Sequence, residues 1–156
     1  MRIELREEPE LPDPVARLVA IGCQEGFPFV ARFAREWAGG RNRFDRPGEV
    51  LLFAYLDGAL AGFGGLDRDP YQGEASVGRV RHVYVEPGAR GQGVGHALVR
   101  ELVRRARPSF ATLRLRTQQA APFYEHLGFR RVSEREATHT LSLDRDEAPT
   151  AGPAAR

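Results

Sequence analysis

The chain has 156 residues, 42% of them apolar, which are the length and composition of one globular domain with an ordinary core. No apolar run approaches the ~20 residues of a membrane span, and residues 1–6 lack a signal-peptide core, so we expect a soluble, cytoplasmic protein with no membrane partner. Cys23 is the single cysteine, which excludes an internal disulfide and a multi-cysteine metal site, and we expect it to be a buried helix residue.

The charged residues also narrow the function. All 23 basic residues are arginines, yet the formal net charge is only +2, which gives at most weak attraction to polyanions. The arginines of residues 94–107 form no uniform basic stripe, because Glu101 stands four residues before Arg105 and is expected to pair with it on a helix. We therefore expect a solvated helix face there and no nucleic-acid partner.

The chain begins with one strand and two helices. Ile3 and Leu5 alternate with charged residues and predict a strand over residues 2–6. Asp13 can cap a helix that has Pro14 at its first position and a buried stripe from Val15 to Gly22. A second helix carries aromatic residues at spacings of three and four between Phe29 and Trp37. We expect these aromatic residues to belong mainly to the core.

A hairpin follows the two helices. The continuous apolar run of residues 50–56 predicts a buried strand. Asp57-Gly58 is a strong turn signal and leads into a third strand over residues 60–66. Three glycines, Gly62, Gly64 and Gly65, weaken this third strand and indicate a bulge or the close approach of another backbone.

The second half of the chain reads as a long strand, a helix and a final group of strands around a short helix. The predicted ranges are a strand over 77–85, a helix over 92–107, a strand over 112–117, a helix over 120–127, and an antiparallel pair over 129–133 and 138–143. Gly128 is the residue expected just past a helix end. Residues after this pair are rich in Ala, Pro, Gly and charge, which is typical of disorder.

The connection between the long strand and the long helix is rich in glycine. Pro87-Gly88 ends the strand, and the apolar stripe of the helix begins at Val94 after an arginine and several glycines. The first amides of a helix lack internal partners, and missing side chains let a ligand approach them, so this helix start predicts an anion site that suits a pyrophosphate. The alternative is a tight turn with close helix–strand packing.

Two motifs connect this chain to a known family. Arg90-x-x-Gly93-x-Gly95, after the strand Val83–Val85, resembles the Arg/Gln-x-x-Gly-x-Gly/Ala motif of the GNAT N-acetyltransferase superfamily, which binds acetyl-coenzyme A. Phe123-Tyr124-Glu125-His126-Leu127-Gly128-Phe129 resembles the downstream motif of the same superfamily. The two occur in the family's order, and together with the strands around them they cover most of the chain.

The resemblance implies an α+β fold. Its sheet is mixed but mostly antiparallel, helices cover both faces, and a parallel fourth and fifth strand splay apart to make the ligand cleft. A parallel pair needs a crossover of a dozen or more residues, and the helix over 92–107 supplies it. We expect a single domain over residues 1–144 and a disordered tail over 145–156.

The resemblance also implies how acetyl-coenzyme A is bound. Backbone groups of the fourth strand would pair with the pantetheine arm, and the glycine-rich helix start would hold the pyrophosphate. The cofactor-binding residues implied are Val83, Tyr84, Val85, Arg90, Gly91, Gln92, Gly93, Val94, Gly95, His96, Gln119 and Phe123.

The catalytic residues follow less directly. Tyr124 resembles the tyrosine that the superfamily uses as general acid toward the departing thiolate; the alternative for Tyr124 is core packing. The superfamily often has a glutamate base on the fourth strand, but here Arg79 and Arg81 stand at the matching positions, next to His82. The base is therefore open among His82, our candidate catalytic residue, and two others, His139 and Glu74. Two helix glutamates, Glu25 and Glu36, could attract an amine from the helical side of the cleft.

Two functions remain in view. The first is an acetyl-coenzyme A-dependent N-acetyltransferase acting on a primary amine of a small molecule or a peptide. The second is a non-catalytic acyl-coenzyme A-binding module, which the missing strand glutamate favours. Acceptor identity and oligomeric state, a homodimer included, stay open at this stage, and thiol release with a panel of amines separates the two functions.

Overall fold

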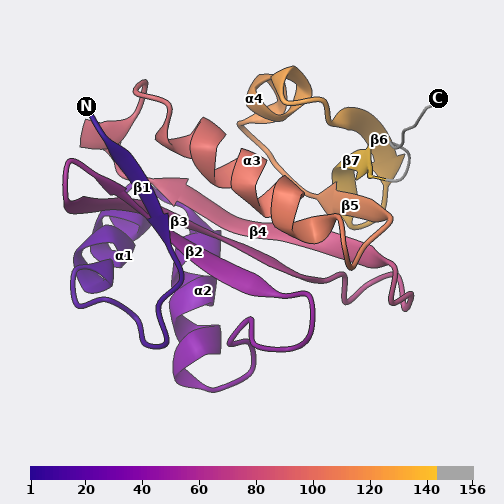
Figure 1. The fold of residues 1–156 in the computed structure, drawn as a ribbon, viewed down its shortest axis with the longest axis horizontal. Coiled ribbons are helices and arrows are strands. Elements are labelled where there is room, and N and C mark those ends of the chain that lie inside the picture. Colours follow the sequence, from indigo (N-terminus) through magenta and orange to yellow (C-terminus); the bar gives the residue numbers. More distant parts are fainter. Residues whose placement is uncertain (144–156) are drawn as a thin grey trace.

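The computed structural model describes residues 1–143, so the tail predicted over 145–156 lies outside the described residues. These residues form one seven-stranded sheet with helices on both faces (Figure 1). The elements are β1 (Ile3–Arg6), α1 (Val15–Gln24), α2 (Pro28–Ala38), β2 (Val50–Leu56), β3 (Ala59–Arg68), β4 (Val77–Val85), the 3-10 turn η1 (Pro87–Ala89), α3 (Val94–Ala106), β5 (Thr112–Leu115), α4 (Ala121–His126), β6 (Arg130–Glu134) and β7 (Ala137–Ser142).

The strand order is β1-β2-β3-β4-β5-β7-β6. All neighbouring strands run antiparallel except β4 and β5, which are parallel and are joined by the crossover helix α3. The α+β fold with a parallel fourth and fifth strand is therefore confirmed. This order makes β4 the central strand, so the glycine-rich loop that joins β4 to α3 starts from the middle of the sheet.

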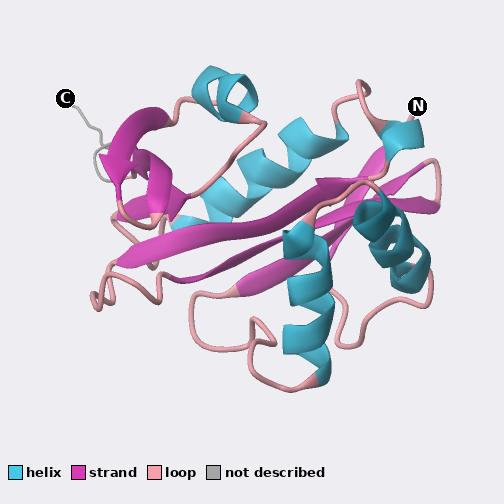
Figure 2. Ribbon diagram, turned by 180° about the vertical axis from the view of Figure 1, so that it is seen from behind, coloured by secondary structure: helices cyan, strands magenta, loops and turns pink. Residues whose placement is uncertain are grey.

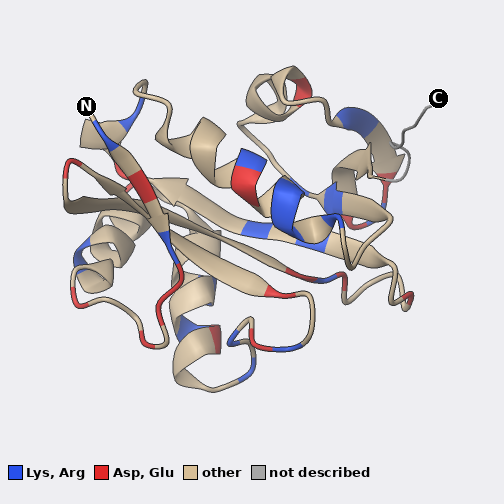
Figure 3. Cartoon of the chain, viewed as in Figure 1, with Lys and Arg blue, Asp and Glu red and all other residues tan. Residues whose placement is uncertain are grey.

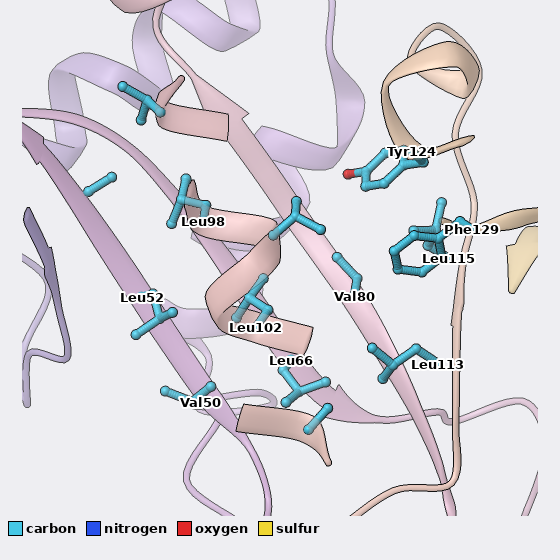
Figure 4. Packing of buried hydrophobic residues seen from close by; sticks show 14 of the residues in the cluster. Val50, Leu52, Leu66, Val80, Leu98, Leu102, Leu113, Leu115, Tyr124 and Phe129 are labelled. Atoms are coloured by element: carbon cyan, nitrogen blue, oxygen red, sulfur yellow. The ribbon is translucent and has the colours of Figure 1, made fainter. Parts of the chain in front are cut away.

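The sheet separates two apolar cores. α3 lies on one face, and α1 and α2 lie on the other (Figures 1 and 2). Leu98 and Leu102 of α3 are fully buried and pack against residues such as Leu52 and Leu66 of the sheet (Figure 4). On the opposite face, Phe33 of α2 stacks on the sheet with a ring-centroid distance of 4.6 Å to Phe63.

The glycines of β3 allow β4 to come close. A Cβ atom on Gly62 would collide with the carbonyl oxygen of Tyr84 on β4. The register between the two strands shifts between Phe63 and Gly65, and His82 of β4 has a left-handed φ of 61° in the irregular stretch. Both options offered by the glycine pattern, a bulge and a close backbone approach, are thus present.

Several predictions about local structure differ from the fold: the helix predicted over 92–107 begins at Val94, and the strand predicted over 60–66 runs from Ala59 to Arg68. β5 ends at Leu115, two residues before the predicted end at Thr117, because only Thr112 to Leu115 pair with β7. Cys23 is exposed and not buried, since the buried stripe of α1 runs through Val15, Leu18 and Gly22, and the next residue is turned about 100° away from it. None of the helices within residues 1–143 has the length and apolar character to cross a membrane.

Candidate active site

A gap opens in the sheet where β4 and β5 separate. Three residue pairs join them, from Val77 with Thr112 to Arg79 with Arg114, and β4 then continues to Val85 without a β5 partner among the described residues. The predicted splay is therefore confirmed. We expected the backbone of Val83, Tyr84 and Val85 to bind the pantetheine arm. It lies in the stretch of β4 that has no partner on the β5 side.

A buried ionic cluster lies where β4 and β5 separate, a point that we call the fork. The last pair places Arg79 directly opposite Arg114, an arrangement of like charges that needs compensation. Asp69 supplies it, because its Oδ2 accepts hydrogen bonds from Arg79 at 3.2 Å and from Arg114 at 3.1 Å. Arg114 also donates to Glu134 of β6 at 2.9 Å. Arg79, at the position where the superfamily often has its base, is thus committed to holding the fork.

The start of α3 presents a row of free amides, which we call the amide cradle, Gly91 to His96. The first helical hydrogen bond runs from Ala97 N–H to Gly93 O at 3.0 Å, and within residues 1–143 the six amides of the cradle have no acceptor. Gly91 and Gly93 have φ values of +78° and +91°, and no atom lies within 4 Å of the place where a Cβ of Gly91 would be. The cradle therefore has donors, open space and the positive end of a helix, which together fit a pyrophosphate.

A groove continues from the cradle along the outer face of α3. Its volume is about 660 Å³, and its lining includes Gly93 and four basic side chains, His96, Arg100, Arg104 and Arg107. Figure 3 shows basic and acidic residues next to each other along α3. Glu101 pairs with Arg105 at 2.9 Å, as predicted, and also with Arg104. The groove is wide enough for the extended part of a nucleotide-linked ligand.

Arg90 fixes the loop in front of the cradle. Its guanidinium makes two hydrogen bonds of 2.8 Å to Glu25 at the end of α1, and its Nε donates to the carbonyl of Val85 at 2.9 Å. Glu25 also accepts a 2.6 Å hydrogen bond from the Tyr84 hydroxyl, and the Arg90 guanidinium holds the pKa of Glu25 below its usual value. Glu25 was considered from the sequence only as an amine attractor, and its partner 65 residues away could not be read from spacing.

Tyr124 lies on α4 at the same side of the sheet as α3. Its ring points toward β4, hydroxyl first (Figure 4), and packs edge-on against Phe123 and Phe129 at ring-centroid distances of 4.9 and 5.7 Å. Phe123 in turn reaches the cradle, since its ring lies 3.4 Å from where a Cβ of Gly95 would be. Burial raises the pKa of Tyr124 above its ordinary value, so the hydroxyl keeps its proton at pH 7. Among residues 1–143 the hydroxyl has no hydrogen-bond partner.

The three candidate bases lie in different surroundings. His82 is buried on the opposite face of the sheet from Tyr124, between Phe33 and Phe44, and desolvation lowers its pKa from 6.5 to about 3. His139 is fully buried and hydrogen bonded through both ring nitrogens, and Glu74 is exposed in the loop before β4. His82 as the base stays a prediction, and its low pKa argues against it because such an imidazole binds an amine's proton weakly.

The remaining predicted residues lie around the cleft. His96 faces α4, with its ring 6.4 Å from that of His126. The side-chain amide of Gln92 donates a hydrogen bond to the carbonyl of Gly88. Val94, the first residue of α3, is buried. Gln119 is exposed in the segment that connects β5 to α4. The structure thus brings the cradle, the end of β4 and α4 together, since the side chains of Phe123 and Val85 both lie within 4 Å of the place where a Cβ of Gly95 would be.

Comparison with known proteins agrees with this geometry. Residues 47–131 match the family model described as an acetyltransferase (GNAT) domain. The chain is 31% identical over 118 residues to N-alpha-acetyltransferase RimI of Mycobacterium tuberculosis, covering 72% of this chain and 67% of the relative. A crystal structure of a proposed acetyltransferase from Exiguobacterium sp. 255-15 superposes with a TM-score of 0.81 and 34% identity over 91% of this chain and 94% of that one.

A more distant structure carries the cofactor. N-acetylglutamate synthase from Neisseria gonorrhoeae, in a complex with coenzyme A and L-arginine, shares the fold with a TM-score of 0.64 and 15% identity. The match covers 92% of this chain and 34% of that one. At this identity the likeness concerns the fold alone.

Proposed function

The chain belongs to the GNAT acetyltransferase family, whose members use acetyl-coenzyme A as cosubstrate, and from that premise we propose that it acetylates a primary amine. The observation that carries the proposal is the amide cradle beside the free edge of β4. Within residues 1–143 six successive amides have no acceptor, more than the four that a helix start leaves free, and a pyrophosphate would supply acceptors to them. The groove beyond the cradle would then take the nucleotide end of the cosubstrate.

The chain's own residues divide the work. The cosubstrate brings an activated acetyl thioester, and an unpaired amide of β4 polarises its carbonyl by donating a hydrogen bond. Tyr124, which is protonated and directed toward β4, stabilises the thiolate as it leaves. Complete proton transfer from the phenol is uphill, because burial raises the pKa of Tyr124 and a thiol has a pKa near 8.5. Hydrogen-bond stabilisation is the role proposed for Tyr124.

Proton removal from the acceptor decides which amines react. An alkylammonium with a pKa of ~10.4 costs roughly 4–5 kcal/mol to deprotonate at pH 7, whereas an α-ammonium with a pKa of ~7.8 costs about 1 kcal/mol. His82 gives little help because its pKa is about 3. We therefore expect a preference for amines of low pKa, which lose their proton to water before they attack. The relative from M. tuberculosis is an N-alpha-acetyltransferase by name, and this supports an α-amine acceptor.

The test is acetyl transfer to a panel that pairs α-amines with alkylamines. Free thiol would be measured as coenzyme A is released, and each acceptor would be weighed for one added acetyl group. The proposal predicts transfer, with α-amines reacting faster at pH 7. Tight cofactor binding without any thiol release would instead support the non-catalytic binding module, and salt-dependent binding to DNA or RNA would support a nucleic-acid role.

A further inference from the structure

The short helix that carries Tyr124 has little holding it in place by itself. α4 has six residues, and the residue before it, Ala120, provides no side-chain cap. A helix of this length is not stable alone in water, so its position depends on contacts with its surroundings. Phe123 and Tyr124 supply the apolar contacts described above, and within residues 1–143 the side-chain hydrogen bonds from α4 to the β6–β7 hairpin are made by one neighbour of Tyr124, Glu125.

Glu125 fastens α4 to the β6–β7 hairpin. Its Oε2 accepts a 2.8 Å hydrogen bond from Nε2 of His139 and a 2.9 Å contact from Arg131. Arg131 and His139 are themselves cross-strand partners in the hairpin. The Glu125 carboxylate thus accepts from His139 and Arg131, which the pairing of β6 with β7 places side by side. Arg131 is 67% exposed, whereas the His139 side chain is completely buried, so the bond to His139 is the one shielded from water.

The other side of the imidazole is connected to the segment between β5 and α4. Nδ1 of His139 lies 2.9 Å from Oγ1 of Thr138, and that oxygen accepts a 3.0 Å hydrogen bond from the amide of Thr117. Thr117 Oγ1 accepts in turn from the amide of Ala120 at 3.0 Å. Because the Glu125 carboxylate can only accept, Nε2 carries the proton that it receives, and in the neutral ring Nδ1 accepts from the hydroxyl of Thr138.

One imidazole therefore joins three parts of the structure: the segment between β5 and α4, the start of α4 and the residue next to Tyr124. We propose that His139 is a positioning residue that sets where the Tyr124 hydroxyl lies relative to β4. The proposal rests on the function proposed above, in which that hydroxyl acts on the leaving thiolate. His139 itself is completely buried among protein groups, so its effect on the reaction would pass through Tyr124.

The first test compares turnover in variants of the network. His139→Phe removes both hydrogen bonds, and we expect kcat to fall by about 10–100-fold with the KM for acetyl-coenzyme A changed less than about threefold, because a shift of about 1 Å at a reacting group costs up to 10². His139→Gln keeps an N–H near Nε2 and should recover most of the rate. Glu125→Ala, a change at the surface, should reproduce the loss even where a core substitution impairs folding.

Thr140→Val is the matched control. Thr140 is the next residue of β7 and is also buried, but its hydroxyl donates to the carbonyl of Leu113 and has no link to α4. We expect this variant to lose stability and keep its kcat. If Thr140→Val lowers kcat as much as His139→Phe does, the effect is general loosening of the hairpin, and the proposal is overturned.

A double-variant cycle then asks whether His139 acts through Tyr124. In a Tyr124→Phe background, His139→Phe should cause no further loss, since the group that it positions is already absent. Multiplied losses would overturn the proposal.

Hydrogen exchange gives a readout that does not need activity. In His139→Phe, the amides of Tyr124 and Leu127, which bond to Ala120 and Phe123 within α4, should exchange at least about tenfold faster, while those of β2 and β3 stay protected. Unchanged α4 protection overturns the positioning role. If the wild-type protein acetylates no amine, the proposed function is refuted. Hydrogen exchange in α4 then still tests whether His139 holds this helix in place.

Discussion

Acid should destabilise this protein through one buried side chain, His82. Burial is the main cause that lowers its pKa from 6.5 to about 3, with Arg81 adding repulsion, so the unfolded chain takes up a proton that the folded chain refuses. Stability from a neutral His82 is fully present above about pH 6.5 and is lost as the pH falls toward 3. For these two pKa values, linkage gives a loss of about 2 kcal/mol between pH 7 and pH 5 from this residue alone.

The measurement is urea unfolding of the wild type and His82→Asn at pH 5, 6 and 7. Asparagine tolerates the left-handed backbone at this position and does not titrate, although it leaves a gap between Phe33 and Phe44 that lowers stability equally at every pH. The wild type should therefore lose about 2 kcal/mol more than the variant between pH 7 and pH 5.

The wild type has to be compared with His82→Asn because Asp67 also titrates in this pH range. Burial raises its pKa to about 6, so it contributes stability at low pH that is lost as the pH rises through 6, opposite to His82. Both proteins contain Asp67, so its effect cancels in the comparison. Parallel curves of stability against pH for the two proteins would refute the argument that His82 is held neutral in the folded state.

Three further predictions test other parts of the site. Tyr124→Phe should slow single-turnover acetyl transfer by roughly 10²–10⁴ with cofactor affinity unchanged, and a rate within about threefold of wild type would remove Tyr124 from the mechanism. Gly93→Val should weaken coenzyme A binding by at least about tenfold in calorimetry, because valine strains the backbone at this positive φ and fills the cradle. Gly40 also has a positive φ and lies in open space, so Gly40→Val is the control and should bind normally. Gly62→Ala should cost about 1–3 kcal/mol in thermal unfolding because its Cβ meets Tyr84 O, whereas the exposed Gly88→Ala should cost much less; equal melting temperatures would contradict the close approach of β3 and β4.

Much of the fold follows from local patterns in the sequence. The apolar run of β2, the Asp57-Gly58 turn and the amphipathic α3 each carry a short-range signal that no distant contact overrides. Boundaries follow less well, since β5 ends where its pairing with β7 ends and not where its alternation of apolar and charged residues ends. The row of free amides at the start of α3 was predictable because its donors are consecutive in the chain.

The polar networks could not be predicted in the same way. Arg114 alternates with leucines in β5, a pattern that indicates a solvent-facing side chain, yet it is buried because Asp69, 45 residues earlier, compensates its charge. His139 stands in a strand as an apparently isolated histidine, and its partner Glu125 comes from another element. Such pairs are set by how strands and helices assemble, which short-range periodicity does not encode.

The central claim is that the amide cradle binds the cosubstrate's pyrophosphate. The most direct measurement is an amide nitrogen–proton NMR titration of the wild type with coenzyme A. The largest shifts should fall on the amides of residues 91–96, which gain acceptors on binding, with smaller shifts along the free edge of β4. Saturable binding that leaves residues 91–96 unmoved, or no binding at millimolar coenzyme A, would contradict the account.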